Sequence, residues 1–301
     1  PLYGTAFRST PVYFLQDDHD HWENDSPLTY PVPWFQLQLA RTTQQLYYPE
    51  FLPDVTRSPG LPYSTSSARG ELSESFGTLR YGRLLEVLLY DVRRTLNVGE
   101  LNSVFLDGNV ENWLVQRTAS KDTRHLVHVP SNPPGWTAGK WGEWYPDVLH
   151  PETRQLTTQI PKPYWRQGWL NQHDRIMQSL ADMKHRNPLV IAGDLHATGV
   201  GTMHGAGIHD FSDNPITNIL CGPVSTSVRG FPSVVRGVHP APSQYLNFQE
   251  QVTPFEEHGF SIVDFEQNRI VAKLFKWDVD SQPVEEIDAL QPYYTVELER
   301  P

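Results

Sequence analysis

Two groups of carboxylates and imidazoles, far apart in the sequence, could hold a metal ion. The first is the run Asp17–His21, and the second is Asp194 together with His196. Acidic side chains this close together repel one another unless a cation lies among them. A solvated acidic turn that caps a helix is the alternative interpretation of the first run. Because the same residue types recur in the second group, the sequence predicts one metal site built from both.

Each group follows a short apolar run that is rich in β-branched or aromatic residues. Val12–Leu15 precedes the first group, and Leu189–Ala192 precedes the second. Such runs predict buried parallel strands, whose carboxyl ends carry the functional side chains in open α/β sheets. Gly193 would let the backbone pass close to a bound group. We therefore expect both groups at one edge of a sheet.

Two further predicted strands also end in polar residues. Residues 84–90 lead into Asp91 and Arg93, and residues 125–129 lead into Asn132. Together the strand ends would form a cup of oxygen and nitrogen donors, which suits iron, manganese, zinc or calcium. A metal ion held in this cup, with open coordination positions, would lower the pKa of a bound water molecule. The expected reaction is therefore hydrolysis.

Two side chains near this cup are candidates for catalysis. Arg93 would bind an oxyanion through its guanidinium group. His19 would donate a proton to a leaving alkoxide, or it would only orient Asp18 from behind. The residues alone leave both roles of His19 open.

The rest of the chain predicts an α/β protein with long irregular stretches. We expect three helices, a glycine-rich loop and a closing hairpin. Residues 52–74 and 135–163 show no hydrophobic period, so we expect loop insertions there. The first helix is expected between Trp34 and Tyr48, where Phe35, Leu39 and Leu46 recur at helical spacing. The other helices are expected from Asp107, with Trp113 and Leu114 on the inner face, and over 165–183; the loop over 199–207; and the hairpin strands over 259–265 and 269–277.

Composition limits the partners of the protein. The 301 residues suit one large domain, and the single cysteine, Cys221, rules out an internal disulfide. A net charge of −11 argues against duplex nucleic acid as a partner, since phosphate backbones require a basic face. No apolar run is long enough to predict a membrane span. The expected partner is a small molecule.

The order of these motifs resembles a known family. Asp17-Asp18-His19-Asp20, the later Asp91-x-Arg93, the Trp113-Leu114 helix, Gly193-Asp194-x-His196 and the closing hairpin from Gly259 are similar to the alkaline phosphatase D (PhoD-like) metallophosphoesterases of the calcineurin-like superfamily. The resemblance implies a four-layer αββα sandwich with two mixed sheets and a metal centre. It also implies a periplasmic or extracellular location.

The resemblance also implies roles for individual residues. Asp18, Asp194 and His196 would be metal ligands, Asn132 a further ligand, and His19 the histidine beside the scissile phosphate. The expected reaction is attack of metal-bound hydroxide on a small phosphate mono- or diester, with Arg93 stabilising the developing charge.

The chain departs from the family pattern at its start. The family carries a first metal-binding strand and a Gly-Asp-x-x-Tyr motif upstream of the Asp-Asp-His segment, and only a few residues precede Pro11 here. We therefore expect residues 1–301 to form the later portion of such a domain, incomplete at the N-terminus and requiring a missing segment. The first alternative is a non-catalytic fragment, or one half of a split assembly, with an incomplete metal centre. The second is a calcium-dependent binding domain, which would not need His196 beside Asp18.

Overall fold

An eight-stranded mixed sheet forms the centre of the protein. The computed structural model describes residues 10–20, 35, 39, 76–93, 96, 98–99, 101–224 and 230–300. The strands of this sheet are β1 (Phe76–Tyr81), β2 (Leu85–Tyr90), β3 (His125–Pro130), β7 (Leu189–Ala192), β8 (Thr198–Ala206), β9 (His209–Asp210), β10 (Ile216–Cys221) and β12 (Leu246–Phe255). Their order is β1-β2-β3-β7-β10-β8-β12, with β9 paired to β8. Strands β2, β3, β7 and β10 run parallel.

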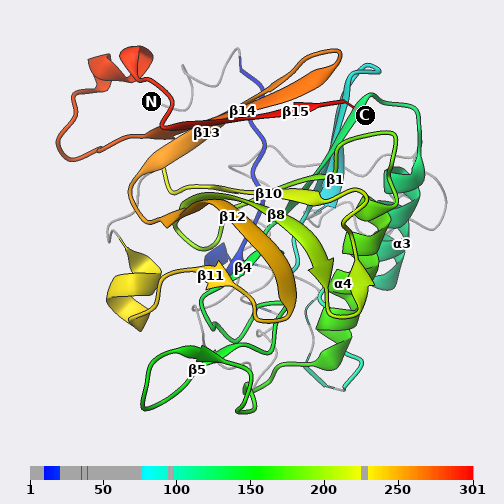
Figure 1. Cartoon of the computed structure of the whole chain (residues 1–301), viewed down its shortest axis with the longest axis vertical. Coiled ribbons are helices and arrows are strands. Elements are labelled where there is room, and N and C mark those ends of the chain that lie inside the picture. The colour runs from blue at the N-terminus through cyan, green and yellow to red at the C-terminus, as the bar shows by residue number, and fades with distance from the viewer. Residues whose placement is uncertain are drawn as a thin grey trace.

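A second, three-stranded sheet covers one face of the central sheet (Figure 1). It consists of β13 (Gly259–Phe265), β14 (Arg269–Lys276) and β15 (Tyr294–Glu299). The predicted hairpin is confirmed as β13 and β14, whereas β15 was not predicted. All pairs in this sheet are antiparallel, so the expectation of two mixed sheets is wrong for it. The short connection between β13 and β14 requires antiparallel pairing, because parallel neighbours need a long crossover.

Two helices cover the opposite face of the central sheet (Figure 1). They are α3 (Gly108–Ala119) and α4 (Gln167–Ala181). The side chain of Asp107 caps α3 by accepting a hydrogen bond from the backbone of Asn109, and Trp113 and Leu114 are buried, as predicted. The α/β class is confirmed. Within the described part of the chain there are three layers, namely helices, mixed sheet and small sheet, rather than four.

Alternating side chains of the inner strands build both cores. Leu126 of β3 and Val190 of β7 contact the helix side, while their neighbours Val127 and Leu189 contact the small sheet. This alternation is the normal consequence of a strand with both faces covered. Because the strands are parallel, the chain leaves β2, β3 and β7 at the same edge of the sheet.

The segment Val12–Leu15 is not a strand, which corrects the sequence prediction. It lies without strand pairing, and the side chains of Tyr13 and Phe14 are 42% and 40% exposed. The inner positions of the sheet are taken by β2, β3, β7 and β10, so this apolar run has no place among them. It leads directly into a short 3-10 helix, η1 (Asp18–Asp20).

The predicted glycine-rich loop at residues 199–207 is instead strand β8. Its glycines make room for an aromatic ring, because a Cβ atom at Gly201 would lie 2.0 Å from Cε1 of Phe248. That ring packs edge-on against Trp136, with centroids 4.8 Å apart. The glycines therefore serve packing across the sheet rather than loop flexibility.

Residues 135–163 are largely irregular; Gly135–Tyr145 are all buried, whereas residues 148–163 are mostly half-buried or exposed. Whether this stretch is an insertion stays a prediction. Residues 52–74, and all of the helix predicted over 34–48 except residues 35 and 39, lie outside the described residues. Among the helices described, none is both long and apolar enough to cross a bilayer. The remaining short elements are β4 (Trp136–Thr137), β5 (Val148–Leu149), β6 (Leu156–Thr157), β11 (Ala241–Pro242), η2 (Phe231–Arg236) and η3 (Val284–Ala289).

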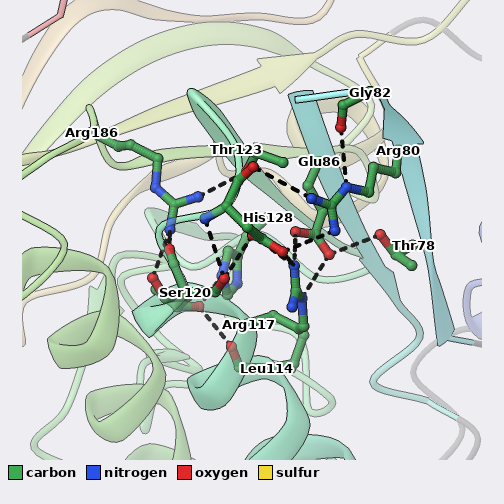
Figure 2. A network of polar contacts seen from close by, with 12 residues as sticks. Thr78, Arg80, Gly82, Glu86, Leu114, Arg117, Ser120, Thr123, His128 and Arg186 are labelled. Atoms are coloured by element: carbon green, nitrogen blue, oxygen red, sulfur yellow. Dashed lines mark hydrogen bonds and ion pairs between the residues drawn. The ribbon is translucent and has the colours of Figure 1, made fainter. Parts of the chain in front are cut away.

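A polar network joins β1, β2, β3 and α3 (Figure 2). Arg117 donates hydrogen bonds of 2.8 and 2.5 Å to the buried carboxylate of Glu86. Further along, the buried ring of His128 contacts Tyr90 Oη at 3.1 Å and Thr118 Oγ1 at 2.9 Å. Thr118 donates its own proton to the Leu114 carbonyl, so His128 Nε2 is the donor and Nδ1 the acceptor. These contacts hold the imidazole in its neutral form.

The neutral state of His128 predicts a pH dependence of stability. Burial, assisted by Arg186, lowers the pKa of His128 to about 3. In the unfolded chain His128 takes up a proton near pH 6.5, whereas in the folded chain it stays neutral down to about pH 3. Its contribution to the free energy of unfolding is therefore fully present above pH 6.5. This contribution falls by about 1.4 kcal/mol per pH unit as the pH drops toward 3. Urea unfolding of His128→Gln should show a weaker acid dependence than wild type. Parallel curves for wild type and His128→Gln would contradict this role.

Candidate metal centre

Sequence-distant residues meet at one cavity of about 220 Å³ at the carboxyl edge of the parallel strands. Four of the predicted site residues line it, namely Asp18, His19, Asp194 and His196. The calcium-dependent binding domain did not require His196 beside Asp18, so this proximity counts against it. The other lining residues are Asp17, Asp20, Lys140 and Phe231.

A tight turn after β7 aims Asp194 and His196 into the cavity. Both residues have positive φ, 67° for Asp194 and 49° for His196, while Leu195 between them is buried in the core. Non-glycine residues adopt such angles rarely, and they concentrate at functional sites. The His196 ring packs against Phe231, with centroids 4.8 Å apart.

A turn at the start of η1 places Asp17 and Asp18. The backbone of Asp20 donates to the Asp17 carbonyl at 3.2 Å, and Asp20 Oδ2 accepts from the Asp17 backbone at 2.8 Å. Asp18 is thereby buried, and its Oδ1 accepts from the backbone of exposed His19 at 3.0 Å. The carboxylates point inward while the imidazole of His19 stays accessible to a ligand.

Arg93 lies behind the carboxylates and is absent from the residues that line the cavity. Its Nε donates to Asp17 Oδ1 at 2.8 Å, and its Nη1 donates to the Gly142 carbonyl at 2.7 Å. Its Nη2 forms an ion pair with Asp194 Oδ1 at 3.1 Å. Direct binding of a substrate oxyanion by Arg93 therefore stays a prediction. Its observed contacts make it a residue that positions two carboxylates.

Asn132 also lies behind the cavity. Its Nδ2 donates to the Gly142 carbonyl at 2.6 Å, the same oxygen that Arg93 contacts. A Cβ atom at Gly142 would lie 2.5 Å from Arg93 Nη1, so glycine is needed there. The role of Asn132 as a metal ligand stays a prediction, since it does not line the cavity.

Lys140 lies among the carboxylates and was not predicted from the sequence. Its Nζ donates to Asp194 Oδ1 at 2.6 Å and lies 3.8 Å from Asp18 Oδ2. Lys140 is only 2% exposed. Its stretch Gly139-Lys140-Trp141-Gly142 has no hydrophobic period. The one available signal was an isolated charge among glycines and tryptophans.

Burial and charge together set the protonation of this cluster. Burial alone would raise the pKa of Asp194, but Lys140 and Arg93 outweigh it and lower the pKa to about 2. Burial and the neighbouring Asp194 raise the pKa of Asp17 well above its usual range. Asp17 therefore holds a proton more readily than Asp194 does.

The donor set fits a metal ion. One oxygen from each of Asp17, Asp18 and Asp194 lies within 4.8 Å of the others. Asp194 Oδ2 and His196 Nδ1 are both buried, and neither has a hydrogen-bond partner among the described residues. Burial lowers the pKa of His196, so its imidazole is neutral, as a metal ligand must be. Buried polar atoms without partners are costly, and a cation held by the three carboxylates could use the free Asp194 Oδ2.

Comparison with known proteins identifies the fold. No protein-family profile and no curated protein sequence matches the chain. A solved structure described as "Structure of PhoD" matches with a TM-score of 0.59 and 14% identity, over 94% of this chain and 52% of that chain. This chain has a PhoD-like fold. At 14% identity the likeness concerns the fold alone, and the chain spans about half the length of that structure.

In this PhoD-like fold, the ion pairs of Arg93 should hold the site together. Arg93→Met leaves Asp17 and Asp194 with one cation fewer in a buried cluster, which costs about 3–5 kcal/mol of unfolding free energy. Urea unfolding with a chelator present measures this loss. Lys184→Met is the control, because the Lys184–Asp213 ion pair is exposed and its removal should leave stability nearly unchanged. Equal stability of the two variants would contradict the role given to Arg93.

Proposed function

We propose that the chain belongs to a metal-dependent hydrolase of phosphate mono- or diesters. The observation that carries this proposal is the convergence of Asp17, Asp18, Asp194 and His196 on one cavity, with donor atoms of Asp194 and His196 left without partners. The PhoD-like fold supports the same class of reaction. Catalysis by this chain alone, and the choice between monoester and diester, are part of the proposal.

Each group at the cavity has a distinct task in this reaction. Asp17, Asp18, Asp194 and His196 would hold the metal, which lowers the pKa of a water molecule and polarises phosphoryl oxygens when bound. Arg93 keeps the carboxylates of Asp17 and Asp194 in place from behind. His19 is exposed at the cavity mouth, where it can donate a proton to the leaving oxygen. The small, open cavity suits a phosphoryl group rather than a large ligand.

A second candidate function is a non-catalytic fragment or one half of a split assembly. Lys140 and Arg93 already neutralise much of the carboxylate charge without a metal, which favours it. The match to about half of a PhoD structure, 52% of that chain, is also consistent with a partial centre. Such a chain would keep its packing but would not turn over phosphoesters by itself.

Hydrolysis of two kinds of substrate tests the proposed reaction. The chain is incubated with manganese, iron, zinc or calcium, and with either p-nitrophenyl phosphate or a simple alkyl phosphate. Asp194→Ala should lose about 100-fold or more in rate on both substrates. His19→Ala should lose about 100-fold on the alkyl ester, whose leaving group needs a proton, and far less on the p-nitrophenyl ester.

Asp213→Ala is the matched control, since Asp213 is an exposed aspartate remote from the cavity, and it should keep the wild-type rate. Wild-type rates in Asp194→Ala would contradict the proposed site. Equal losses on both esters in His19→Ala would remove the proton-donor role. No hydrolysis by the wild-type chain with any of the metals would favour the second candidate.

A further inference from the structure

Lys140 takes up the space in which a cation is expected. Its ammonium nitrogen lies 2.6 Å from Asp194 Oδ1 and 3.8 Å from Asp18 Oδ2. Asp18 and Asp194 are two of the three carboxylates whose oxygens could share a metal. A positive charge at that position attracts the same oxygens that a divalent ion would need.

The backbone around Lys140 is fixed, so its position is not that of a mobile surface lysine. Arg236 donates to the carbonyls of Ala138 and Gly139 at 3.2 and 2.9 Å. On the other side, the Gly142 carbonyl accepts hydrogen bonds from Arg93 and Asn132. Glu143 anchors the same stretch by accepting from Thr137 Oγ1 at 2.5 Å and from the Ala138 backbone at 2.7 Å. These contacts fix the backbone on both sides of Lys140, so that its ammonium group faces the carboxylates.

We propose that Lys140 is an internal counter-ion that competes with a divalent metal for Asp18 and Asp194. The ammonium group stabilises the cluster in the metal-free chain, and its charge opposes a divalent ion at the same carboxylates, whichever oxygen of Asp194 the ion uses. The metal affinity of the chain is therefore set by the charge of Lys140, which we expect a bound metal to push away from Asp194, as well as by the number of ligands. This inference rests on the metal binding assumed in the proposed function, and it concerns how that binding is regulated.

Lys162 provides a matched comparison. It is a second buried lysine, which donates to Glu143 Oε2 at 3.3 Å and to the Tyr145 carbonyl at 2.9 Å. It does not line the cavity. Removing its charge alters the packing of the same irregular stretch without changing the charge beside Asp194. Lys162→Gln therefore separates a general loss of stability from a specific effect on the metal site.

Calorimetric titration with Mn²⁺ tests the competition. Lys140→Gln keeps a hydrogen-bond donor for Asp194 but removes the charge, and it should bind Mn²⁺ at least about tenfold more tightly than wild type. Lys162→Gln should bind Mn²⁺ as wild type does. Equal affinities of wild type and Lys140→Gln would overturn the counter-ion role and leave the proposed metal-dependent function standing. If neither chain bound Mn²⁺, the counter-ion proposal would fail, and if the wild-type chain also bound no iron, zinc or calcium, the metal-dependent function would fail with it.

Thermal unfolding tests the same competition even if Lys140→Gln is less stable than wild type. With a chelator present, Lys140→Gln should melt below wild type, because Asp18 and Asp194 lose their nearest cation. Added Mn²⁺ should raise its melting temperature by more than that of wild type, since the metal replaces the missing charge. If Lys140→Gln folds only with Mn²⁺, the competition is supported. If Mn²⁺ fails to restore it, or raises both chains equally, the competition is contradicted.

Discussion

The contact of Asp194 with two buried cations is the interaction on which the candidate site depends. One carboxylate oxygen of Asp194 faces both Lys140 Nζ and Arg93 Nη2, and Arg93 in turn holds Asp17. Three segments that are far apart in the sequence are thereby tied together at one edge of the sheet. Buried charges of this kind are costly unless each has a partner. The cluster is stable only while each buried acidic group keeps a basic partner, because an unpaired buried charge destabilises the fold.

The fold explains why these segments meet. Parallel strands β2 and β7 deliver Arg93 and Asp194 to the same edge, since both residues closely follow strand ends. The helices on one face and the small sheet on the other bury the strands between two cores. A rigid sheet of this kind holds its loops in place, which a catalytic or metal-binding site requires. The irregular stretch after β3 then brings Lys140 across to this edge.

Local patterns predicted much of the structure. The apolar run before Asp194, the cap at Asp107 and the helical stripe before β7 each contain their own signal, and each element formed where expected. The convergence of Asp18, His19, Asp194 and His196 was predicted correctly from the order of the motifs, although only Asp194 and His196 follow a parallel strand. The strand expected at Val12–Leu15 did not form, because an apolar run alone does not show whether a sheet has a free position for it.

What could not be predicted depends on contacts between distant residues. The glycines of β8 resemble a loop until Phe248 is known to pack on Gly201. Lys140 lies in a stretch without period, and only the folded chain places it beside Asp194. Arg93 was expected to face a substrate, and only the folded chain shows that its Nε and Nη1 donate to Asp17 and Gly142 while its Nη2 forms an ion pair with Asp194. The charge balance of a buried cluster is a property of tertiary structure, which spacing in the sequence does not encode.

We infer that this cluster is a cation site which Lys140 occupies when no metal is bound. Diffraction from crystals grown with Mn²⁺, recorded at the manganese absorption edge, distinguishes the two occupants. We expect an anomalous peak within bonding distance of Asp18, Asp194 and His196, with the Lys140 ammonium moved away from Asp194. Crystals soaked in Mn²⁺ that show no peak there, with Lys140 still bound to Asp194, would contradict it.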